Sequence, residues 1–351
     1  MSEPLGERPS RAQRSVLVAM SGGVDSSVAA ALLLEAGHEV VGATLKLWGG
    51  PSDSGCCSVA DVDDARRVAS QLGIDHYVFN LADDFDAGVV APYVADHAAG
   101  RTPNPCIECN RTIKFDRLLR RADALGFDAL ATGHHARVAD GRLLRGADRA
   151  KDQSYVLHVV GREALRRVLL PVGELTKGEV RARARALGLR TAAKPDSQEV
   201  CFIPGAAGGR RRFLAERVDL TPGRVVDTAG AVVGSVAAVE LVTVGQRRGL
   251  GLAAGAPRYA VGVDLAAATV TVGATDDLLV DEVRLSRCSW LADEPVGAVE
   301  AQCSAHGEPF PAEWDALSST VRFRSPVRRV APGQSVVLYR GDEVLGGGLA
   351  T

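Results

Sequence analysis

The organisation of this chain can be worked out from SVLVAMSGGVDSS, residues 15–27. Residues 15–20 form a short apolar run that predicts a buried strand, and residues 26–37 carry apolar side chains at helical spacing. Between them, Gly22 and Gly23 let the backbone approach an anion closely, and the helix that follows offers free N–H groups and the positive end of its dipole. The stretch therefore predicts a strand, a loop and a helix arranged to bind a phosphate group.

The loop belongs to neither of the two common glycine-rich nucleotide motifs. It has no lysine after its glycines, as G-x-x-x-x-G-K-[ST] requires, and it lacks the spacing of G-x-G-x-x-G. A plain glycine turn between a strand and a helix is the alternative. The three serines and the aspartate gathered in the same few residues argue against that alternative.

Further strand and helix signals alternate along the first part of the chain. Strand-like runs follow at residues 39–48, 76–81, 127–133 and 168–172. Ser58 with Asp61, and Thr176 with Glu179, have the spacing of capping boxes that open helices. Strands separated by helix-length segments predict a parallel sheet with helices on both faces, and such sheets bind ligands at the carboxyl ends of their strands.

The pattern changes after about residue 205. Short runs rich in β-branched residues, bounded by Gly, Asp or Pro, replace the alternation and predict small β-rich modules. We therefore expect three domains: 1–205 as an α/β domain, and 206–278 and 279–351 as small β-rich domains of a kind that can close as barrels.

Composition narrows the class of protein. The 351 residues include 41 basic and 43 acidic side chains, a net charge of −2, which argues against a nonspecific DNA coat but allows a local basic surface. No apolar run has the length of a membrane span, and the first residues lack the apolar core of a secretory signal, so we expect a cytoplasmic protein without a membrane partner. Seven cysteines, an odd number, in such a setting favour metal binding or catalysis over structural disulfides.

The cysteines themselves leave several readings open. Cys106 and Cys109 form a C-x-x-C in RTPNPCIECNRTIKF, but a zinc site needs four ligands and no second C-x-x-C is present. A thioredoxin-like pair needs its own βαβ setting, and two buried structural cysteines are equally compatible with the spacing. Cys201, in the apolar run VCFI, is either a core cysteine or a thiol that Lys194 activates.

SGGVDSS resembles the PP-loop of the N-type ATP pyrophosphatases, which hold the pyrophosphate end of ATP while a substrate is adenylated. The resemblance implies that Asp25 helps to hold magnesium and the leaving group. Amidotransferase synthetases, tRNA lysidine synthetases and tRNA sulfurtransferases all carry versions of this loop, so it indicates a superfamily and not a substrate.

A closer resemblance, to the tRNA-specific 2-thiouridylases, runs from residue 19 to the end of the chain. It is carried by AMSGGVDSS, LKLW with GCCSVADVDDA, GRTPNPCIECNRTIKF, ALATGHHAR, KDQSYVLH, KPDSQEVCFI, VGQRRGLGLA and PGQSVVLY, in the order of that family. The resemblance implies a PP-loop domain, a small central domain and a C-terminal β-barrel.

The same resemblance assigns roles to individual residues. The implied ATP site comprises Ala19, Met20, Ser21, Gly22, Gly23, Val24, Asp25, Ser26, Leu45 and Gly133. The implied catalytic pair is Cys201, which carries sulfur as a persulfide, and Cys109. Contact with the target base is implied for Asn104, Pro105 and Cys106. Contact with tRNA is implied for His134, Lys151, Asp152, Gln153, Arg322, Phe323 and Gln334. The sequence departs from the family at Leu45, where Met is frequent, and some members have Asp in place of Cys106.

The function implied is ATP-dependent 2-thiolation of the wobble uridine of tRNAs that read Lys, Glu and Gln codons. ATP and Mg²⁺ would be required, tRNA would be the substrate, and a persulfide protein or cysteine desulfurase would supply sulfur. The alternatives are an iron–sulfur cluster on Cys106, Cys109 and Cys201 that activates sulfide, another PP-loop tRNA-modifying ligase, and a noncatalytic tRNA-binding protein. No residues are assigned to a further metal site.

Overall fold

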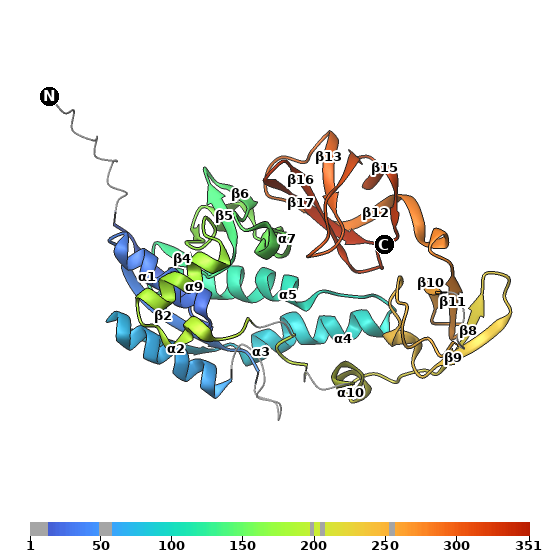
Figure 1. Cartoon of the computed structure of the whole chain (residues 1–351), viewed down its shortest axis with the longest axis horizontal. Helices are drawn as coiled ribbons and strands as arrows, with labels where there is room; N and C mark the ends of the chain where they lie inside the picture. Colours follow the sequence, from blue (N-terminus) through green and yellow to red (C-terminus); the bar gives the residue numbers. More distant parts are fainter. Residues whose placement is uncertain (1–12, 49–57, 197–199, 204–207, 253–256) are drawn as a thin grey trace.

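The computed structural model describes residues 13–48, 58–196, 200–203, 208–252 and 257–351. Cys56 and Cys57, and the first twelve residues on which the expectation about a secretory signal depended, lie outside these ranges. Figure 1 shows an α/β part, a central β module at its far end and a barrel.

The α/β part is built on a five-stranded parallel sheet. Its strands, in the order β3-β2-β1-β4-β7, are His76–Asn80, Glu39–Lys46, Ser15–Ala19, Ala129–Ala131 and Val168–Leu169. Alternate residues of β1 face opposite sides: Val16 and Val18 belong to one buried cluster and Leu17 to another. Burial on both faces is what a parallel sheet requires, so the predicted class of fold is confirmed.

Helices cover the sheet where the sequence predicted them. On one face, buried residues of α1 (Val24–Glu35), α2 (Val59–Leu72) and α9 (Lys177–Ala186) share a hydrophobic cluster with Val16 and Val18 of β1. Both capping boxes are present: the Ser58 hydroxyl accepts from the Asp61 N–H at 3.2 Å, and the Thr176 hydroxyl accepts from the Glu179 N–H at 3.3 Å. Each box satisfies N–H groups that a helix end would otherwise leave without partners.

A continuous helical stretch carries the C-x-x-C. It runs through α5 (Pro105–Glu108), the π-helix η2 (Cys109–Arg117) and α6 (Leu118–Ala124). The remaining helical elements are α3 (Ala82–Phe85), η1 (Asp86–Val90), α4 (Ala91–Ala98), η3 (Arg149–Lys151), α7 (Ser154–Leu157), α8 (Arg162–Leu165), η4 (Arg190–Ala193), α10 (Gly209–Ala215), η5 (Val239–Leu241) and η6 (Asp276–Leu278).

Two β modules follow, each with its own buried cluster. The central one orders β10-β11-β8-β9, which are Tyr259–Asp264, Thr269–Gly273, Gly223–Asp227 and Val232–Val236. The barrel strands are β12 (Leu279–Trp290), β13 (Gly297–Gln302), β14 (Phe310–Asp315), β15 (Thr320–Arg328), β16 (Ser335–Arg340) and β17 (Glu343–Ala350). Because β12 pairs with both β15 and β17, this sheet closes on itself.

The barrel sheet continues into the α/β part. A hairpin of β5 (Ala136–Ala139) and β6 (Arg142–Arg145) adds to its edge, where Glu343 of β17 pairs with Leu144. The three-part architecture is confirmed, whereas the boundaries at 205/206 and 278/279 stay predictions. No helix in the described ranges is both long and apolar enough to cross a membrane.

Candidate active site

The loop after β1 is shaped by glycines. Gly22 has φ +70°, and a Cβ there would overlap the backbone oxygen of Asp61. Gly133, beyond the end of β4, lies against the first turn of α1, and a Cβ at this position would be 2.5 Å from the Ser26 nitrogen. Gly23 is the extended N-cap of α1 and offers no side chain to its first turn. The N–H groups of that turn are therefore available to an anion.

Ser21 and Ser26, the two serines of the predicted ATP site, use their hydroxyls differently. The Ser26 hydroxyl is buried, accepts from the Ser21 N–H at 3.2 Å and donates to the Gly23 carbonyl at 3.2 Å. Ser21 is exposed. Ser26 therefore stiffens the loop, and Ser21 presents the hydroxyl that a ligand can reach.

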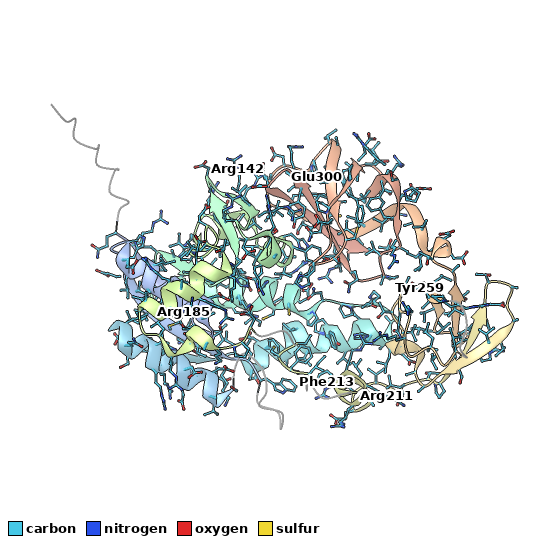
Figure 2. All side chains as sticks on the ribbon, in the orientation of Figure 1. Arg142, Arg185, Arg211, Phe213, Tyr259 and Glu300 are labelled. Carbon is cyan, nitrogen blue, oxygen red and sulfur yellow. The ribbon has the colours of Figure 1, made fainter. Side chains whose placement is uncertain are left out.

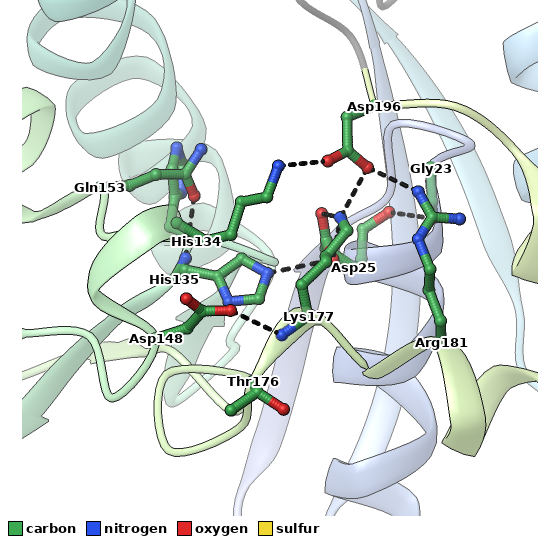
Figure 3. Close-up of polar contacts among 12 residues, drawn as sticks. Gly23, Asp25, His134, His135, Asp148, Gln153, Thr176, Lys177, Arg181 and Asp196 are labelled. Atoms are coloured by element: carbon green, nitrogen blue, oxygen red, sulfur yellow. Dashed lines mark hydrogen bonds and ion pairs between the residues drawn. The ribbon is translucent and has the colours of Figure 1, made fainter. Parts of the chain in front are cut away.

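The carboxylate of Asp25 contacts a lysine and a histidine (Figure 3). Lys177 Nζ lies 2.8 Å and 2.7 Å from its two carboxylate oxygens, and His135 Nε2 lies 3.1 Å from Oδ1. Burial acts to raise the pKa of Asp25, but the hydrogen bonds and charges of His135 and Lys177 outweigh it, so this pKa is lowered. The carboxylate is thus held ionised beside the loop.

Asp196 joins the same cluster from the segment that leads to Cys201. It pairs with Lys151 at 2.9 Å, Lys177 at 2.8 Å and Arg181 at 2.8 Å. Burial acts to raise its pKa, and the hydrogen bonds from Lys177 and Lys151 lower it to about 2. Through its ion pairs with Asp25 and Asp196, Lys177 therefore links the phosphate loop to the segment that precedes Cys201.

Lys194 is used differently from our expectation. Its Nζ donates to the Gly22 carbonyl at 3.0 Å and pairs with Asp61 at 2.6 Å and Asp64 at 2.8 Å. These contacts all lie at the loop and α2, so they lend no support to activation of Cys201 by Lys194. Lys194 instead ties α2 to the loop.

The predicted base-contact segment begins a helix. Asn104 is the N-cap of α5, and its side-chain oxygen accepts from the Cys106 N–H at 3.0 Å. Pro105 occupies the first helical turn, where a missing N–H costs nothing. Cys106 is exposed, whereas Cys109 is buried one turn further on. Asn104 therefore has a structural role in addition to the one expected.

Cys109 and Cys201 both pack in the same large hydrophobic cluster. Cys109 is part of it, and the half-buried Cys201 packs against it, next to the fully buried Phe202. Leu45, predicted as an apolar wall of the ATP site, lies in this cluster as well. Among the described residues, no three His, Cys, Asp or Glu side chains are grouped so that they could hold a metal ion.

The rest of the predicted ATP site lies at the carboxyl end of β1. Ala19 ends the strand and is half-buried. Met20 follows it and is almost fully buried, with its N–H donating to the Ala43 carbonyl at 2.8 Å. Val24 is the buried first residue of α1. These three residues therefore flank the loop and are held by backbone and packing contacts.

The predicted tRNA contacts of the α/β part are engaged within the protein. The Asp152 carboxylate is nearly buried against Arg145 at 3.2 Å, and the Gln153 side-chain oxygen accepts from the His135 N–H at 2.8 Å. His134 Nδ1 lies 2.7 Å from the Thr132 hydroxyl, and burial lowers the pKa of His134 well below its usual value. Lys151 retains the most accessible charge of this group.

The three predicted contacts on the barrel are dispersed. Arg322 is half-exposed and pairs with Asp315 at 3.1 Å. Phe323, next to it on β15, is buried in the barrel core, which leaves its ring little surface for a ligand. The Gln334 amide donates to the Thr102 carbonyl, just before the C-x-x-C helix.

Sequence reasoning missed four residues of the cluster around Asp25. They are His135, Lys177, Arg181 and Asp196. One signal was available: the capping box at Thr176 makes Lys177 the first residue of a helix in a domain whose ligands collect at the strand ends. The other partners come from distant parts of the chain and leave no local pattern.

The fold and the loop define the class as a PP-loop ATP pyrophosphatase. Three family models match: a tRNA methyl transferase HUP domain over residues 14–205, a tRNA methyl transferase PRC-barrel domain over 211–274 and an aminomethyltransferase β-barrel domain over 280–350. The chain belongs to the tRNA-specific 2-thiouridylase family.

Relatives named tRNA-specific 2-thiouridylase MnmA match nearly the whole chain. The protein of Mycobacteroides abscessus is 49% identical, covering 96% of this chain and 99% of its own. The protein of Salinispora arenicola is 50% identical, covering 94% of this chain and 97% of its own. Among solved structures, a 4-thiouridine synthetase–RNA complex with bound ATP is 19% identical with a TM-score of 0.38, covering 54% of this chain and 45% of that one. That likeness is too remote to support an inference.

Proposed function

We propose that this enzyme uses ATP to replace the C2 oxygen of the wobble uridine of tRNA by sulfur, on tRNAs that read Lys, Glu and Gln codons. The observation that carries the proposal is that Cys109 and Cys201 both pack into the hydrophobic cluster of the domain that holds the PP-loop. A tRNA-modifying ligase without sulfur chemistry has no need of two thiols there. The family membership supports the same reaction.

ATP fits the loop by the chemistry of its donors. The first turn of α1 offers backbone N–H groups, and Lys177 and Lys194 place positive charge on either side. These groups would stabilise the charge that develops on pyrophosphate as the uracil C2 oxygen attacks the α-phosphorus.

Asp25 is suited to Mg²⁺, which proteins often hold through one or two carboxylates together with substrate phosphates. Bound there, the metal would neutralise charge on the phosphates. Lys177 meanwhile keeps Asp25 ionised and oriented. We propose Ala19, Met20, Val24, Leu45 and Gly133 as the walls that shape this site around the nucleotide.

Sulfur transfer then takes place in two steps. The terminal sulfur of a Cys201 persulfide attacks C2 of the adenylated base, and AMP leaves with the former C2 oxygen. The Cys109 thiolate attacks the Sγ atom of Cys201, so that the S–S bond of the persulfide breaks and its electron pair stays with the sulfur on C2. A Cys109–Cys201 disulfide remains, which an external dithiol must reduce. Release assisted by Cys109 without a disulfide is the variant of this last step.

The thiol assignment is tested by serine variants. Cys109→Ser and Cys201→Ser should each abolish 2-thiouridine formation, because each removes a group that makes or breaks a sulfur bond. Cys106→Ser should be milder, because Cys106 is exposed and the resemblance implies that a carboxylate can replace its thiol. The assay incubates enzyme, ATP, tRNA, a dithiol, and a cysteine desulfurase with cysteine as the persulfide source, and measures nucleosides by mass spectrometry.

Cys288→Ser is the matched control, since Cys288 is a half-buried thiol in the barrel. Thiolation retained by either Cys109→Ser or Cys201→Ser would remove that residue from the mechanism. An inactive Cys106→Ser variant would favour the iron–sulfur alternative on Cys106, Cys109 and Cys201. Iron analysis of anaerobically purified protein separates the two, because the persulfide route needs no iron.

The remaining partners follow from the chemistry. A persulfide-carrying protein or a cysteine desulfurase would load Cys201, and the cytoplasm, where thiols stay reduced, would be the setting. The tRNA contacts proposed are Lys151, Arg322 and Gln334, together with His134, Asp152, Gln153 and Phe323, whose side chains the protein itself also uses. Asn104, Pro105 and Cys106 are proposed to face the target base.

A further inference from the structure

The β5–β6 hairpin physically joins the barrel to the PP-loop domain. The Arg145 N–H donates to the Asp342 carbonyl at 2.8 Å, and the Asp342 carboxylate pairs with Arg137 at 2.6 Å and with Arg149. Deeper in the contact, the Tyr155 hydroxyl donates to the Ser335 carbonyl at 2.7 Å. The hairpin and the segment that follows it are therefore tied to the barrel at several points.

Arg145 lies at the centre of this contact and has three partners. Its Nη1 is 2.8 Å from the Gln302 side-chain oxygen and 3.2 Å from the Asp152 carboxylate. Its guanidinium carbon lies 3.6 Å from the centre of the Tyr339 ring. Gln302 and Tyr339 belong to the barrel, and Asp152 to the PP-loop domain. A planar guanidinium can serve all three at once, whereas an ammonium cannot.

A chain of hydrogen bonds leads from Arg145 to the phosphate loop. Asp152 accepts from the Gly146 N–H at 2.9 Å and the Ser154 N–H at 3.0 Å, which fixes the turn that contains Gln153. Gln153 donates its N–H to the His135 carbonyl at 2.9 Å and accepts from the His135 N–H at 2.8 Å. His135 then contacts Asp25.

We infer that Arg145 is a positioning residue that couples the seating of the barrel to Asp25 of the PP-loop, so that tRNA held by the barrel favours the ATP-binding geometry. The inference rests on the proposed function for the identity of tRNA as the ligand. Because Arg145 is nearly buried, salt and water screen its contacts little. Displacement of the barrel would break the Gln302 and Tyr339 contacts of Arg145 and leave it only its ion pair with Asp152.

Three variants separate the two sides of this contact. Arg145→Lys can keep the charge pair with Asp152 but loses the guanidinium hydrogen bond to Gln302 and the stacking on Tyr339. Gln302→Leu removes the barrel acceptor of Arg145 and leaves every residue of the PP-loop domain unchanged, whereas Gln302→Glu retains an acceptor. Arg142→Gln is the control on the same hairpin, since Arg142 is half-exposed and its nearest barrel carboxylate, that of Glu343, is 4.0 Å away (Figure 2).

The measurement is the dissociation constant of ATP without tRNA divided by that with tRNA, a ratio above one when tRNA tightens ATP binding. Wild-type protein, Gln302→Glu and Arg142→Gln should bind ATP more tightly with tRNA present. Arg145→Lys and Gln302→Leu should lower that ratio by about 2- to 30-fold. A purely structural role would lower the melting temperature and weaken ATP binding equally in both conditions.

A wild-type ratio of one, or unchanged ratios in Arg145→Lys and Gln302→Leu, would overturn the inference. Should Arg145→Lys not fold, Gln302→Leu decides alone. Failure of the proposed function is distinguishable, because it would appear as wild-type protein that forms no 2-thiouridine whatever its ATP affinity.

Discussion

At the scale of single residues, Lys177 is the side chain on which the phosphate site depends. It is the first residue of α9, and its ammonium bridges Asp25 and Asp196. It is also nearly buried, so its charge acts in a medium where electrostatic interactions are stronger than in water. The arrangement places a cation where pyrophosphate would form, at no cost of reorganisation during the reaction.

We predict that Lys177→Ala lowers the rate of tRNA-dependent pyrophosphate release by roughly 10²- to 10³-fold, the effect typical of removing one pre-aimed charge-stabilising group. Arg185→Ala is the control, because Arg185 is an exposed cation on the last turn of the same helix (Figure 2). Coupled assay of pyrophosphate measures both variants. A rate within threefold of wild type for Lys177→Ala would exclude this role.

At the scale of elements, the phosphate loop depends on the close approach of α2 to α1. Asp61, within the capping box of α2, presents its backbone oxygen to Gly22 and its carboxylate to Lys194. The cap that begins α2 is therefore also the wall of the loop. A side chain at position 22 would have to displace backbone atoms, which yield less readily than a flexible side chain.

We predict that Gly22→Ala destabilises the protein by about 2–4 kcal/mol, from positive φ and overlap together, and abolishes measurable ATP binding. Gly37→Ala is the matched control: it has φ +81° but no described atom within 4 Å of a new Cβ. It should cost only about 1–2 kcal/mol and leave ATP binding intact. Thermal melting and calorimetric titration measure the two effects, and equal losses in both variants would contradict this account.

At the scale of the whole molecule, buried histidines lie where the parts pack together. His97, in the last turn of α4, is nearly fully buried, with its ring 4.6 Å from that of Tyr93. Burial, reinforced by Arg210, lowers the pKa of His97 to about 4. Burial likewise lowers the pKa of His158 in the core to about 4. Both side chains are neutral in the folded protein at neutral pH.

The sign of the pH dependence follows. Between pH 6.5 and about 4 the unfolded chain binds protons that the folded chain does not, so stability falls as the pH falls through this window. Each histidine contributes about 3 kcal/mol at most. Burial lowers the pKa of His134 as well, so three buried histidines share this effect. We predict that His97→Phe, which keeps a ring against Tyr93, loses about a third of the drop in unfolding free energy between pH 7.5 and 4.5. Urea titrations at the two pH values test this, and a drop equal to that of wild type would contradict it.

Much of the fold followed from local patterns. The strand before Gly22, the helix after it and both capping boxes depend on residues a few positions apart, and their spacing survives in any tertiary context. The parallel arrangement followed from the alternation of strands and helices. The closure of the barrel did not, because pairing of β12 with β17 depends on residues far apart along the chain.

By itself, the sequence determined the class of fold, the phosphate loop and, through its resemblance to one family, the chemistry to expect. Only the tertiary structure decided that Lys177 and Asp196 belong with Asp25, that Cys109 and Cys201 meet one cluster, and that the Phe323 ring is buried in the barrel. The physical reason is the distance along the chain over which each kind of interaction is set. Helical and strand periodicities, caps and turns are set by neighbours in the chain, whereas ion pairs and burial are set by which surfaces the connections bring together.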